Sequence, residues 1–347
     1  MKVLMIAPLP PPSGGIASWT VRYKDYCKDS NLSLEIVNTA MIGNRSTTET
    51  NKRNYFDEIL RTRKIFRDLK TKLKSFKPEV IHFNTSCSKF GVIRDALCIR
   101  YSKKIVPIIT HCRCNIEDQL HGRISLWAFR YIIKSSKKVI VLNEDSKKYV
   151  DSLCLNKSVF IPNFVNEKML TQDHNINESI KTIVTVGHVE YTKGLNELIC
   201  AANALPLYSF VLVGAICEDL SKVEIPDNMN LTGRVDIEAV KKYLDAADVF
   251  LFPSKTEGFS NALLEAMARG LPVIASDVGA NKAMIEDKGG VIIENCDVHS
   301  IKKAISIIAT QASRRKASEW NINKVKEEYM IDNVMNKYIN LYKEVIS

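Results

Sequence analysis

Several patterns that would classify a protein at once are missing from this chain of 347 residues. No apolar run approaches the ~20 residues that a membrane-spanning helix needs. The apolar start of the chain is interrupted by prolines before it reaches the length of a signal-peptide core. There is no GxGxxG fingerprint, so dinucleotide oxidoreduction gains little support, and no repeat of solenoid period. We therefore expect a cytoplasmic globular protein rather than a transmembrane one.

The cysteines likewise lack any recognisable framework. There are nine, an odd number, with irregular spacing and no CxxC pair. Most lie in apolar runs, where a free cysteine behaves as a small hydrophobic residue. This usage favours a reducing compartment over a set of disulfides. Cys112 and Cys114 are too close together to indicate a metal site by themselves, so no metal and no cofactor is expected.

Charge is plentiful but unevenly distributed along the chain. Residues 1–165 contain 29 basic and 14 acidic side chains, a net charge of +15, and residues 166–347 carry −5. This division suggests two domains with different partners. The basic half could face lipid headgroups, nucleic acid or a phosphorylated substrate. It has no recognised nucleic-acid motif or clear aromatic platform, so we expect no nucleic-acid partner.

Strands and helices alternate throughout the chain, which predicts an α/β fold with parallel sheets. The expected strands are residues 2–7, 34–38, 79–83, 105–110, 138–142, 182–187, 209–213, 248–252, 271–275 and 290–293. A polar, weakly periodic stretch near 162–180 separates two doubly wound halves. We predict an N-terminal domain at 1–165, a C-terminal domain at 166–325, and a final helix at 326–347 that packs back on the N-terminal domain. Ligands in such sheets bind at the carboxyl ends of the strands.

The most informative segment is SKTEGFSNALLEAMARGLPVIAS, residues 254–276. Ser260 is placed to cap a helix that runs to about Arg269 and stops at Gly270. Within it, ALLEAMA is apolar except for Glu265, so the helix should be buried. A buried carboxylate needs hydrogen-bond donors, and a ribose diol supplies two. The alternative is a Glu265 satisfied by a backbone amide or a lysine, with the preceding Glu257 simply solvated.

A second segment, PLPPPSGGIASW at residues 8–19, leads from a strand through a Gly-Gly turn into a helix. Exposed backbone amides at the start of a helix suit a phosphate group. The alternative is an ordinary tight turn between a strand and a helix.

The spacing Glu257–x7–Glu265 within EGFSNALLEAMARGLPVIASDVGA resembles the signature of family 4 retaining glycosyltransferases of the GT-B fold. The resemblance continues in register through VGHVEYTKGLNELI at 186–199, LTGRVDIEAVKKYLDAADVFLFPS at 231–254 and IPNFVN at 161–166. It is strong over about 161–295 and looser over 1–160, where the Gly-Gly loop and THCR at 110–113 are the matching points. The members it most resembles make bacterial surface polysaccharides.

The resemblance implies a GT-B fold of two Rossmann-like domains that face each other across a cleft. It also implies roles for residues in the second half. Lys193 would neutralise the departing diphosphate, which removes the need for a metal ion. The family usually has an arginine five residues earlier, where this chain has His188. Glu257 would contact the hydroxyls of the donor sugar and Glu265 would hold the ribose. Backbone groups would bind the sugar, the diphosphate and the base at Gly258, Phe259, Ser260, Asn261, Gly233 and Val235.

Three residues of the first half are implicated by the same resemblance. Gly14 and Gly15 would close over the diphosphate, and His111 would approach the donor sugar. For His111 the alternative is a strand-end histidine bonded to backbone. His82, which also ends a strand, is expected to be structural.

The implied activity is transfer of a hexose or N-acetylhexosamine from a nucleotide-diphosphate sugar, with UDP favoured, and with retention at the anomeric carbon. The expected acceptor is a lipid-linked saccharide at the inner face of the membrane. The alternatives are a sugar-nucleotide epimerase, a GT-B enzyme with a soluble acceptor, and a catalytically silent subunit that binds a partner enzyme.

The segment 57–77, DEILRTRKIFRDLKTKLKSFK, predicts a basic amphipathic helix. Its apolar face would comprise Ile59, Phe66, Leu69, Leu73 and Phe76. A helix of this kind can lie on an anionic bilayer. We expect the apolar stripe to pack in the core while the charges around Lys70, Lys72 and Lys74 contact lipid headgroups. The alternative is an ordinary domain helix whose charges are solvated.

Overall fold

The protein was analysed as a computed structural model that describes residues 1–11, 14–40 and 55–347. Pro12 and Ser13 of the Gly-rich loop lie outside the described residues. The chain divides into two compact units, which are described separately below. Unit 1 comprises residues 1–163 and 334–347, and unit 2 comprises residues 164–333. Each of the described helices is too short or too polar to cross a bilayer.

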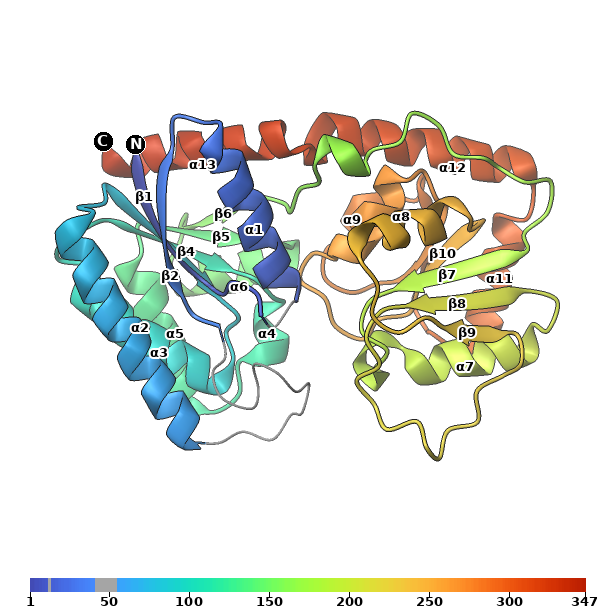
Figure 1. Cartoon of the computed structure of the whole chain (residues 1–347), viewed down its shortest axis with the longest axis horizontal. Coiled ribbons are helices and arrows are strands. Elements are labelled where there is room, and N and C mark those ends of the chain that lie inside the picture. The colour runs from blue at the N-terminus through green and yellow to red at the C-terminus, as the bar shows by residue number, and fades with distance from the viewer. Residues whose placement is uncertain (12–13, 41–54) are drawn as a thin grey trace. The chain divides into compact units, whose positions relative to one another are not determined.

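Unit 1 is built on a six-stranded parallel sheet (Figure 1). Its strands, in the order β2-β1-β3-β4-β5-β6, are β2 Ser33–Asn38, β1 Lys2–Ala7, β3 Val80–Thr85, β4 Ile108–Cys112, β5 Lys138–Val141 and β6 Ser158–Phe160. Its helices are α1 Gly15–Lys28, α2 Tyr55–Ser75, α3 Lys89–Ser102, α4 Ile116–Gln119, α5 Arg123–Ser135, α6 Glu144–Leu153 and α13 Ile331–Ile346. From β1 the chain goes to β2 on one side and then to β3 on the other. This reversal makes the crevice between β1 and β3 the topological switch point of the unit.

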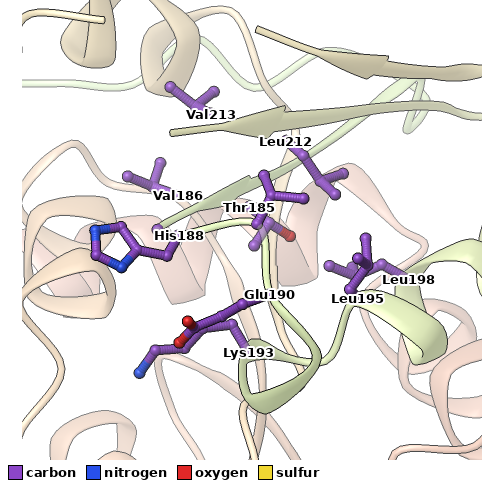
Figure 2. A pocket seen from close by; sticks show the side chains of 11 residues that line it. Thr185, Val186, His188, Glu190, Lys193, Leu195, Leu198, Leu212 and Val213 are labelled. Atoms are coloured by element: carbon purple, nitrogen blue, oxygen red, sulfur yellow. The ribbon is translucent and has the colours of Figure 1, made fainter. Parts of the chain in front are cut away.

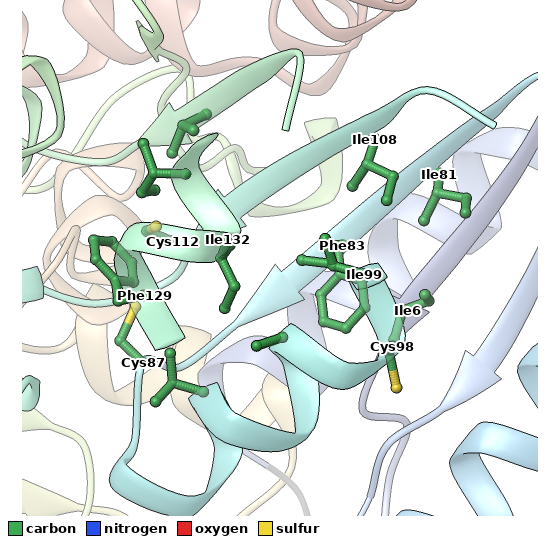
Figure 3. Packing of buried hydrophobic residues seen from close by; sticks show 14 of the residues in the cluster. Ile6, Ile81, Phe83, Cys87, Cys98, Ile99, Ile108, Cys112, Phe129 and Ile132 are labelled. Carbon is green, nitrogen blue, oxygen red and sulfur yellow. The ribbon is translucent and has the colours of Figure 1, made fainter. Parts of the chain in front are cut away.

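The two faces of this sheet have different partners because successive side chains of a strand point to opposite faces. Ile81 and Phe83 of β3 belong to an apolar core with residues of α2, α3 and α5, part of which is drawn in Figure 3. His82, between them, contacts Tyr342 of α13. The α13 face is therefore the polar and aromatic one, and the α2, α3 and α5 face is the apolar one.

Unit 2 has the same design with a second six-stranded parallel sheet. In the order β12-β11-β10-β7-β8-β9, its strands are β12 Gly290–Ile293, β11 Val273–Ser276, β10 Val249–Phe252, β7 Thr182–Val186, β8 Ser209–Val213 and β9 Met229–Leu231. Its helices are η2 Glu167–Met169, η3 Tyr191–Lys193, α7 Leu195–Ala204, α8 Ile237–Asp245, α9 Asn261–Ala268, α10 Asn281–Ile285, α11 Val298–Ile307, α12 Gln311–Lys324 and a π-helical turn at Val325–Tyr329. The predicted α/β fold with two doubly wound parallel sheets is confirmed.

Three sequence expectations need correction. The strands β6 and β9 were not predicted, because three residues are too few to show a period. The final helix is interrupted by the π-helical turn, and residues 326–333 stay with unit 2, where Met330 pairs with Val165. Ile59, placed on the apolar face of the basic helix, is 58% exposed, whereas Ile65, one position before Phe66, is buried.

Candidate active site

The predicted site residues of unit 2 gather at the switch point of its sheet. The chain leaves β7 toward β8 and β9, then returns to place β10 on the other side of β7. Neighbouring parallel strands that diverge in this way leave a crevice beyond their carboxyl ends. His188 and Lys193 follow β7, and Glu257 and Ser260 follow β10. Residues 64 positions apart in sequence are therefore brought to one edge of the sheet.

Lys193 and Glu257 meet directly at this edge. The Nζ atom of Lys193 lies 2.7 Å from Oε1 of Glu257, and the two side chains are 27% and 12% exposed. The hydroxyl of Ser254 donates to the same carboxylate oxygen over 3.0 Å. A charge-assisted hydrogen bond in a partly buried setting holds both groups in one orientation. The pair thus presents an ammonium and a carboxylate side by side to the crevice.

The two loops that carry this pair are fastened to each other by backbone contacts. The amide of Lys255 donates to the carbonyl of Thr192 over 2.9 Å. Gly194, beside Lys193, has φ +85°, and a Cβ added there would lie 2.3 Å from the carbonyl oxygen of Pro253. At this position only glycine permits both the backbone conformation and the close approach. The lysine is therefore positioned by tertiary packing of its loop against the end of β10.

Helix α9 begins directly after the Glu257 loop. The Ser260 hydroxyl accepts a hydrogen bond from the Leu263 amide over 3.2 Å, which confirms the predicted N-cap. The helix ends before Gly270, whose φ is +75°. Five of its residues are buried and Glu265 is half-buried. The predicted burial of the helix is therefore confirmed, and Glu265 lies at the edge of the buried face.

Residues flanking the cap differ in exposure. Phe259 is 5% exposed and its ring packs edge-to-face against Tyr329, with centroids 5.5 Å apart. The side chain of Phe259 is thus occupied by the core, and its backbone is the part that a ligand can meet. Asn261 is half-buried in the first turn. Free backbone N–H groups at the start of a helix carry partial positive charge and suit a phosphate.

Gly233 and Val235 lie in the turn between β9 and α8. Gly233 has φ +67°, and a Cβ added there would meet no atom within 4 Å. Its carbonyl accepts from the amide of Gly214 over 3.2 Å, and the amide of Gly187 donates to Val213 over 2.9 Å. These hydrogen bonds hold the ends of β7, β8 and β9 close together. The segment predicted to meet the nucleobase therefore lies at the same sheet edge as His188.

His188 takes part in a group of three side chains with the chemistry of metal ligands. Beyond β7 and β8, Val189 pairs with Ile216 in parallel, so His188, Glu190 and Cys217 share one face of this short ladder. Their ligand atoms lie within 4.8 Å of one another. His, Cys and carboxylate donors suit zinc. His188 and Glu190 also line a small pocket with Lys193, where the polar ends of all three lie on one side (Figure 2).

In unit 1, Gly14 and Gly15 lie at the junction between β1 and α1, at the switch point of that unit. Gly14 occupies the N-cap position of α1 without a side-chain cap, and Gly15 is the first residue of the helix. Nothing lies within 4 Å of a Cβ added at Gly14. Gly14 thus gives α1 no side-chain cap, and an anion can stabilise a helix start of this kind.

His111, on β4, is fully buried, and both of its ring nitrogens have partners. Its Nδ1 lies 3.1 Å from Nε2 of His82, and its Nε2 lies 3.1 Å from Nη1 of Arg113. Beyond His82 the chain of bonds continues to the Tyr342 hydroxyl at 2.5 Å and from there to the Tyr23 hydroxyl at 2.8 Å. His82 is structural in this arrangement, as expected. His111 contacts Arg113 rather than open space.

The donor and the acceptor in each hydrogen bond of this series follow from Arg113, because a guanidinium group can only donate. His111 must accept at Nε2 and therefore carries its proton at Nδ1. It donates to Nε2 of His82, which in turn carries its proton at Nδ1 and donates to Tyr342. Burial, followed by the charge of Arg113, lowers the pKa of His82 to about 3. Burial, Arg113 and His82 hold the pKa of His111 well below its usual value.

We therefore expect both imidazoles to be Nδ1–H tautomers that stay neutral in the folded protein. In the unfolded chain they protonate near pH 6.5. The stability that the neutral rings contribute is complete above that pH and is lost as the pH falls below 6.5, by roughly 1.4 kcal/mol per pH unit for each ring. Nitrogen-15 NMR of labelled histidine will check this. Protonation of either ring near pH 6 in the folded state would contradict it.

Arg113 is the residue that sequence reasoning overlooked. It is 9% exposed, its Nε has no partner among the described residues, and no carboxylate in that part of the chain forms an ion pair with it. Its guanidinium carbon lies 4.4 Å from the centroid of the Trp19 ring. Burial lowers its pKa to about 10, so it remains charged at neutral pH. The THCR segment at residues 110–113 could have indicated Arg113, because this arginine comes two residues after His111 and follows the end of the same strand.

Residues 166–324 match the family model described as Glycosyl transferases group 1. An uncharacterized glycosyltransferase of Methanocaldococcus jannaschii is 23% identical over 66% of this chain, and the match spans 65% of that protein. The UDP-Gal:α-D-GlcNAc-diphosphoundecaprenol α-1,3-galactosyltransferase of Escherichia coli is 26% identical over 76% of this chain and 78% of its own length.

The fold has close counterparts among solved structures. The sucrose-phosphate synthase of Thermosynechococcus elongatus superposes with a TM-score of 0.82 over 99% of this chain and 98% of its own, at 16% identity. This likeness confirms the predicted GT-B class of fold. Residues 166–324, which hold the Lys193–Glu257 pair and helix α9, are thus the part of the chain that is similar to the Glycosyl transferases group 1 model.

Proposed function

We propose that the protein is a retaining glycosyltransferase that moves a hexose or N-acetylhexosamine from a UDP-sugar to a lipid-linked saccharide acceptor. The observation that carries the proposal is the Lys193–Glu257 pair, held at 2.7 Å at the switch point and followed by the start of α9. This arrangement offers a cation and a helix N-terminus for a diphosphate, together with a carboxylate for sugar hydroxyls. The name of the E. coli relative, which specifies a UDP-sugar and a diphosphoundecaprenol acceptor, supports both substrate classes.

In this proposal each group of unit 2 acts on a different part of the donor. Lys193 and the amides at Ser260 and Asn261 stabilise the negative charge of the departing diphosphate. Glu257 accepts hydrogen bonds from the sugar, and the half-buried Glu265 accepts them from the ribose. Backbone at Gly258, Phe259, Gly233 and Val235 completes the surface for the sugar and the base. Lys193 provides the charge that a metal ion would otherwise supply.

The bond between the anomeric carbon and the phosphate oxygen breaks as the acceptor oxygen attacks from the same face. The departing phosphate oxygen takes the proton of the acceptor hydroxyl, so the protein supplies orientation and electrostatic stabilisation rather than a base. Gly14 and Gly15 at the start of α1 are proposed to meet the diphosphate. His111 is proposed to serve the donor site by orienting the cation of Arg113.

His188 stands where related enzymes have arginine. A neutral imidazole donates one hydrogen bond, whereas a guanidinium donates a charged fork. This difference favours the second candidate, a silent subunit that retains the fold and binds a nucleotide without turnover. The retained Lys193, Glu257 and Glu265 favour the enzyme.

The test is a screen for hydrolysis of UDP- and GDP-sugars by the purified protein, with EDTA present, using wild type and Glu257→Ala. We expect one UDP-sugar to be hydrolysed slowly by the wild type and at least ~100-fold more slowly by the variant, since an interaction with the reacting sugar is removed. Unchanged UDP affinity in the variant would show that its fold is intact. UDP binding without turnover, even with added acceptor lipid, would favour the silent subunit, and absence of nucleotide binding would overturn the proposal. Activity that requires zinc would contradict a metal-independent mechanism.

A further inference from the structure

A groove of about 800 Å³ lies in unit 1 where α2, α3 and α5 meet. It is on the apolar face of the sheet, which is the face opposite His82 and Tyr342. The groove residues come from all three helices and from the turn after α3. They are Thr62, Arg63, Phe66, Arg94, Leu97, Cys98, Arg100, Tyr101, Lys103, Lys104 and Tyr131.

The wall contributed by α3 follows directly from helical periodicity. Arg94, Leu97, Cys98 and Tyr101 are spaced i, i+3, i+4 and i+7, so they form one continuous stripe. Phe66 of α2 packs edge-to-face against Tyr101 with ring centroids 5.3 Å apart. The groove therefore has an apolar and aromatic floor between two helices.

The charged residues of the groove are all basic. Five of its eleven residues are arginine or lysine, and none is acidic. Arg94 is neutralised by the buried Asp95 at 2.7 Å. The exposed Arg63, Arg100 and Lys104 form no ion pair with any carboxylate in the described part of the chain. Three uncompensated cations around an apolar floor are complementary to an amphiphile with an anionic head.

The surface beside the groove is unusually apolar. Leu97 is 54% exposed, and Ile105, just after Lys104, is 56% exposed. On α5, Ile124 is 70% exposed and Trp127 is 67% exposed. Trp127 stacks on Tyr131 of the groove with centroids 6.2 Å apart. Tryptophan and aliphatic side chains next to basic residues are typical of surfaces that rest in the interfacial layer of a bilayer.

We propose that this groove binds an anionic phospholipid at the bilayer surface, with the phosphate among Arg63, Arg100 and Lys104 and the lipid chain against the exposed Leu97. The proposal rests on the membrane-bound acceptor of the proposed function and assigns the membrane contact to defined residues. Single-stranded nucleic acid is disfavoured because it needs open aromatic faces. Lys70 already lies over the Phe66 and Tyr101 rings, 4.7 and 5.1 Å from their centroids.

The structure revises which residues of the basic face predicted around Lys70, Lys72 and Lys74 are proposed to contact lipid. Lys72 pairs with Glu35 at 2.8 Å, so part of its charge is compensated within the fold. Lys70 covers the aromatic floor of the groove. The lipid contact proposed here is thus centred on α3 and the start of its following turn rather than on α2 alone.

The experiment is co-sedimentation with phosphatidylcholine vesicles that contain or lack 30% phosphatidylglycerol, at low and at physiological salt. The test variant combines Arg63→Glu, Arg100→Glu and Lys104→Glu. The matched control combines Lys24→Glu, Lys137→Glu and Lys148→Glu, which are exposed in unit 1 outside the groove and change the net charge equally. We expect binding to the anionic vesicles to weaken by roughly a hundredfold in the test variant, since each basic residue near the surface contributes a factor of about five.

The control variant should lose much less, because its charges do not surround an apolar floor. A second variant, Leu97→Ser with Trp127→Ser, keeps every charge and should weaken binding about tenfold. Equal losses in the two charge variants, unchanged binding in the serine variant, or preference for a single-stranded RNA oligonucleotide over anionic vesicles would each overturn the proposal. Donor hydrolysis by the wild type without vesicles decides the proposed function separately.

Discussion

Replacing Lys193 by methionine is expected to lower sugar transfer and donor hydrolysis by about 10²–10³-fold. Methionine keeps most of the length and volume of the side chain but removes its charge. The lost cation is the one that lies 2.7 Å from Glu257 and next to the small pocket lined by His188. Because the charge of the diphosphate increases as the bond to the sugar breaks, we expect kcat to fall more than UDP affinity.

The chain offers a matched control in Lys255, which lies on the adjacent loop. Its Nζ is 3.1 Å from Glu197 and its side chain is 51% exposed. Lys255→Met removes an equal charge from the same edge of unit 2 and should change kcat by less than about threefold. Steady-state kinetics on both variants would decide between a specific phosphate contact and a general effect of charge. Equal losses in the two variants would refute the role proposed for Lys193.

Replacing Tyr342 by phenylalanine is expected to destabilise unit 1 by roughly 2–4 kcal/mol. The hydroxyl of Tyr342 stands between His82 and Tyr23, at 2.5 and 2.8 Å, and all three side chains are fully buried. Removing it leaves a ring nitrogen and a phenol without their partner, and an unsatisfied buried polar group costs about 1–3 kcal/mol. The midpoint and slope of urea unfolding, followed by tryptophan fluorescence, provide the measurement.

Tyr338, one turn earlier on α13, is the control for this prediction. It is as buried as Tyr342, but its hydroxyl has no hydrogen-bond partner among the described residues. Tyr338→Phe should therefore leave the stability unchanged or raise it slightly, since a polar group that gains nothing from burial is removed. If both variants unfold at the same urea concentration, the chain of bonds from Tyr23 to Arg113 does not contribute to stability.

Local sequence was sufficient to predict the elements that carry the unit 2 site. The Ser260 cap, the stop at Gly270 and the apolar run of α9 depend on neighbours within one or two helical turns. They can therefore be predicted without knowing the fold. Strands of four or more residues were also predicted, because buried parallel strands are continuous apolar runs. The alternation of strands and helices also predicted parallel sheets, which the structure confirms.

What the sequence could not determine are the contacts between residues far apart in the chain. The pairing of Lys193 with Glu257 depends on β7 and β10 being neighbours and on the close approach of Gly194 to Pro253. The sequence identified His111 as a histidine at the end of a strand. It could not show that both ring nitrogens have partners, because this depends on the adjacency of β3 and β4 and on the return of α13 to unit 1. The sequence by itself thus determined the local elements and indicated candidate site residues, Arg113 excepted, because side-chain type and local period are encoded locally. The tertiary structure alone decided which partner each of them meets, because hydrogen bonds and ion pairs depend on distances that only packing sets.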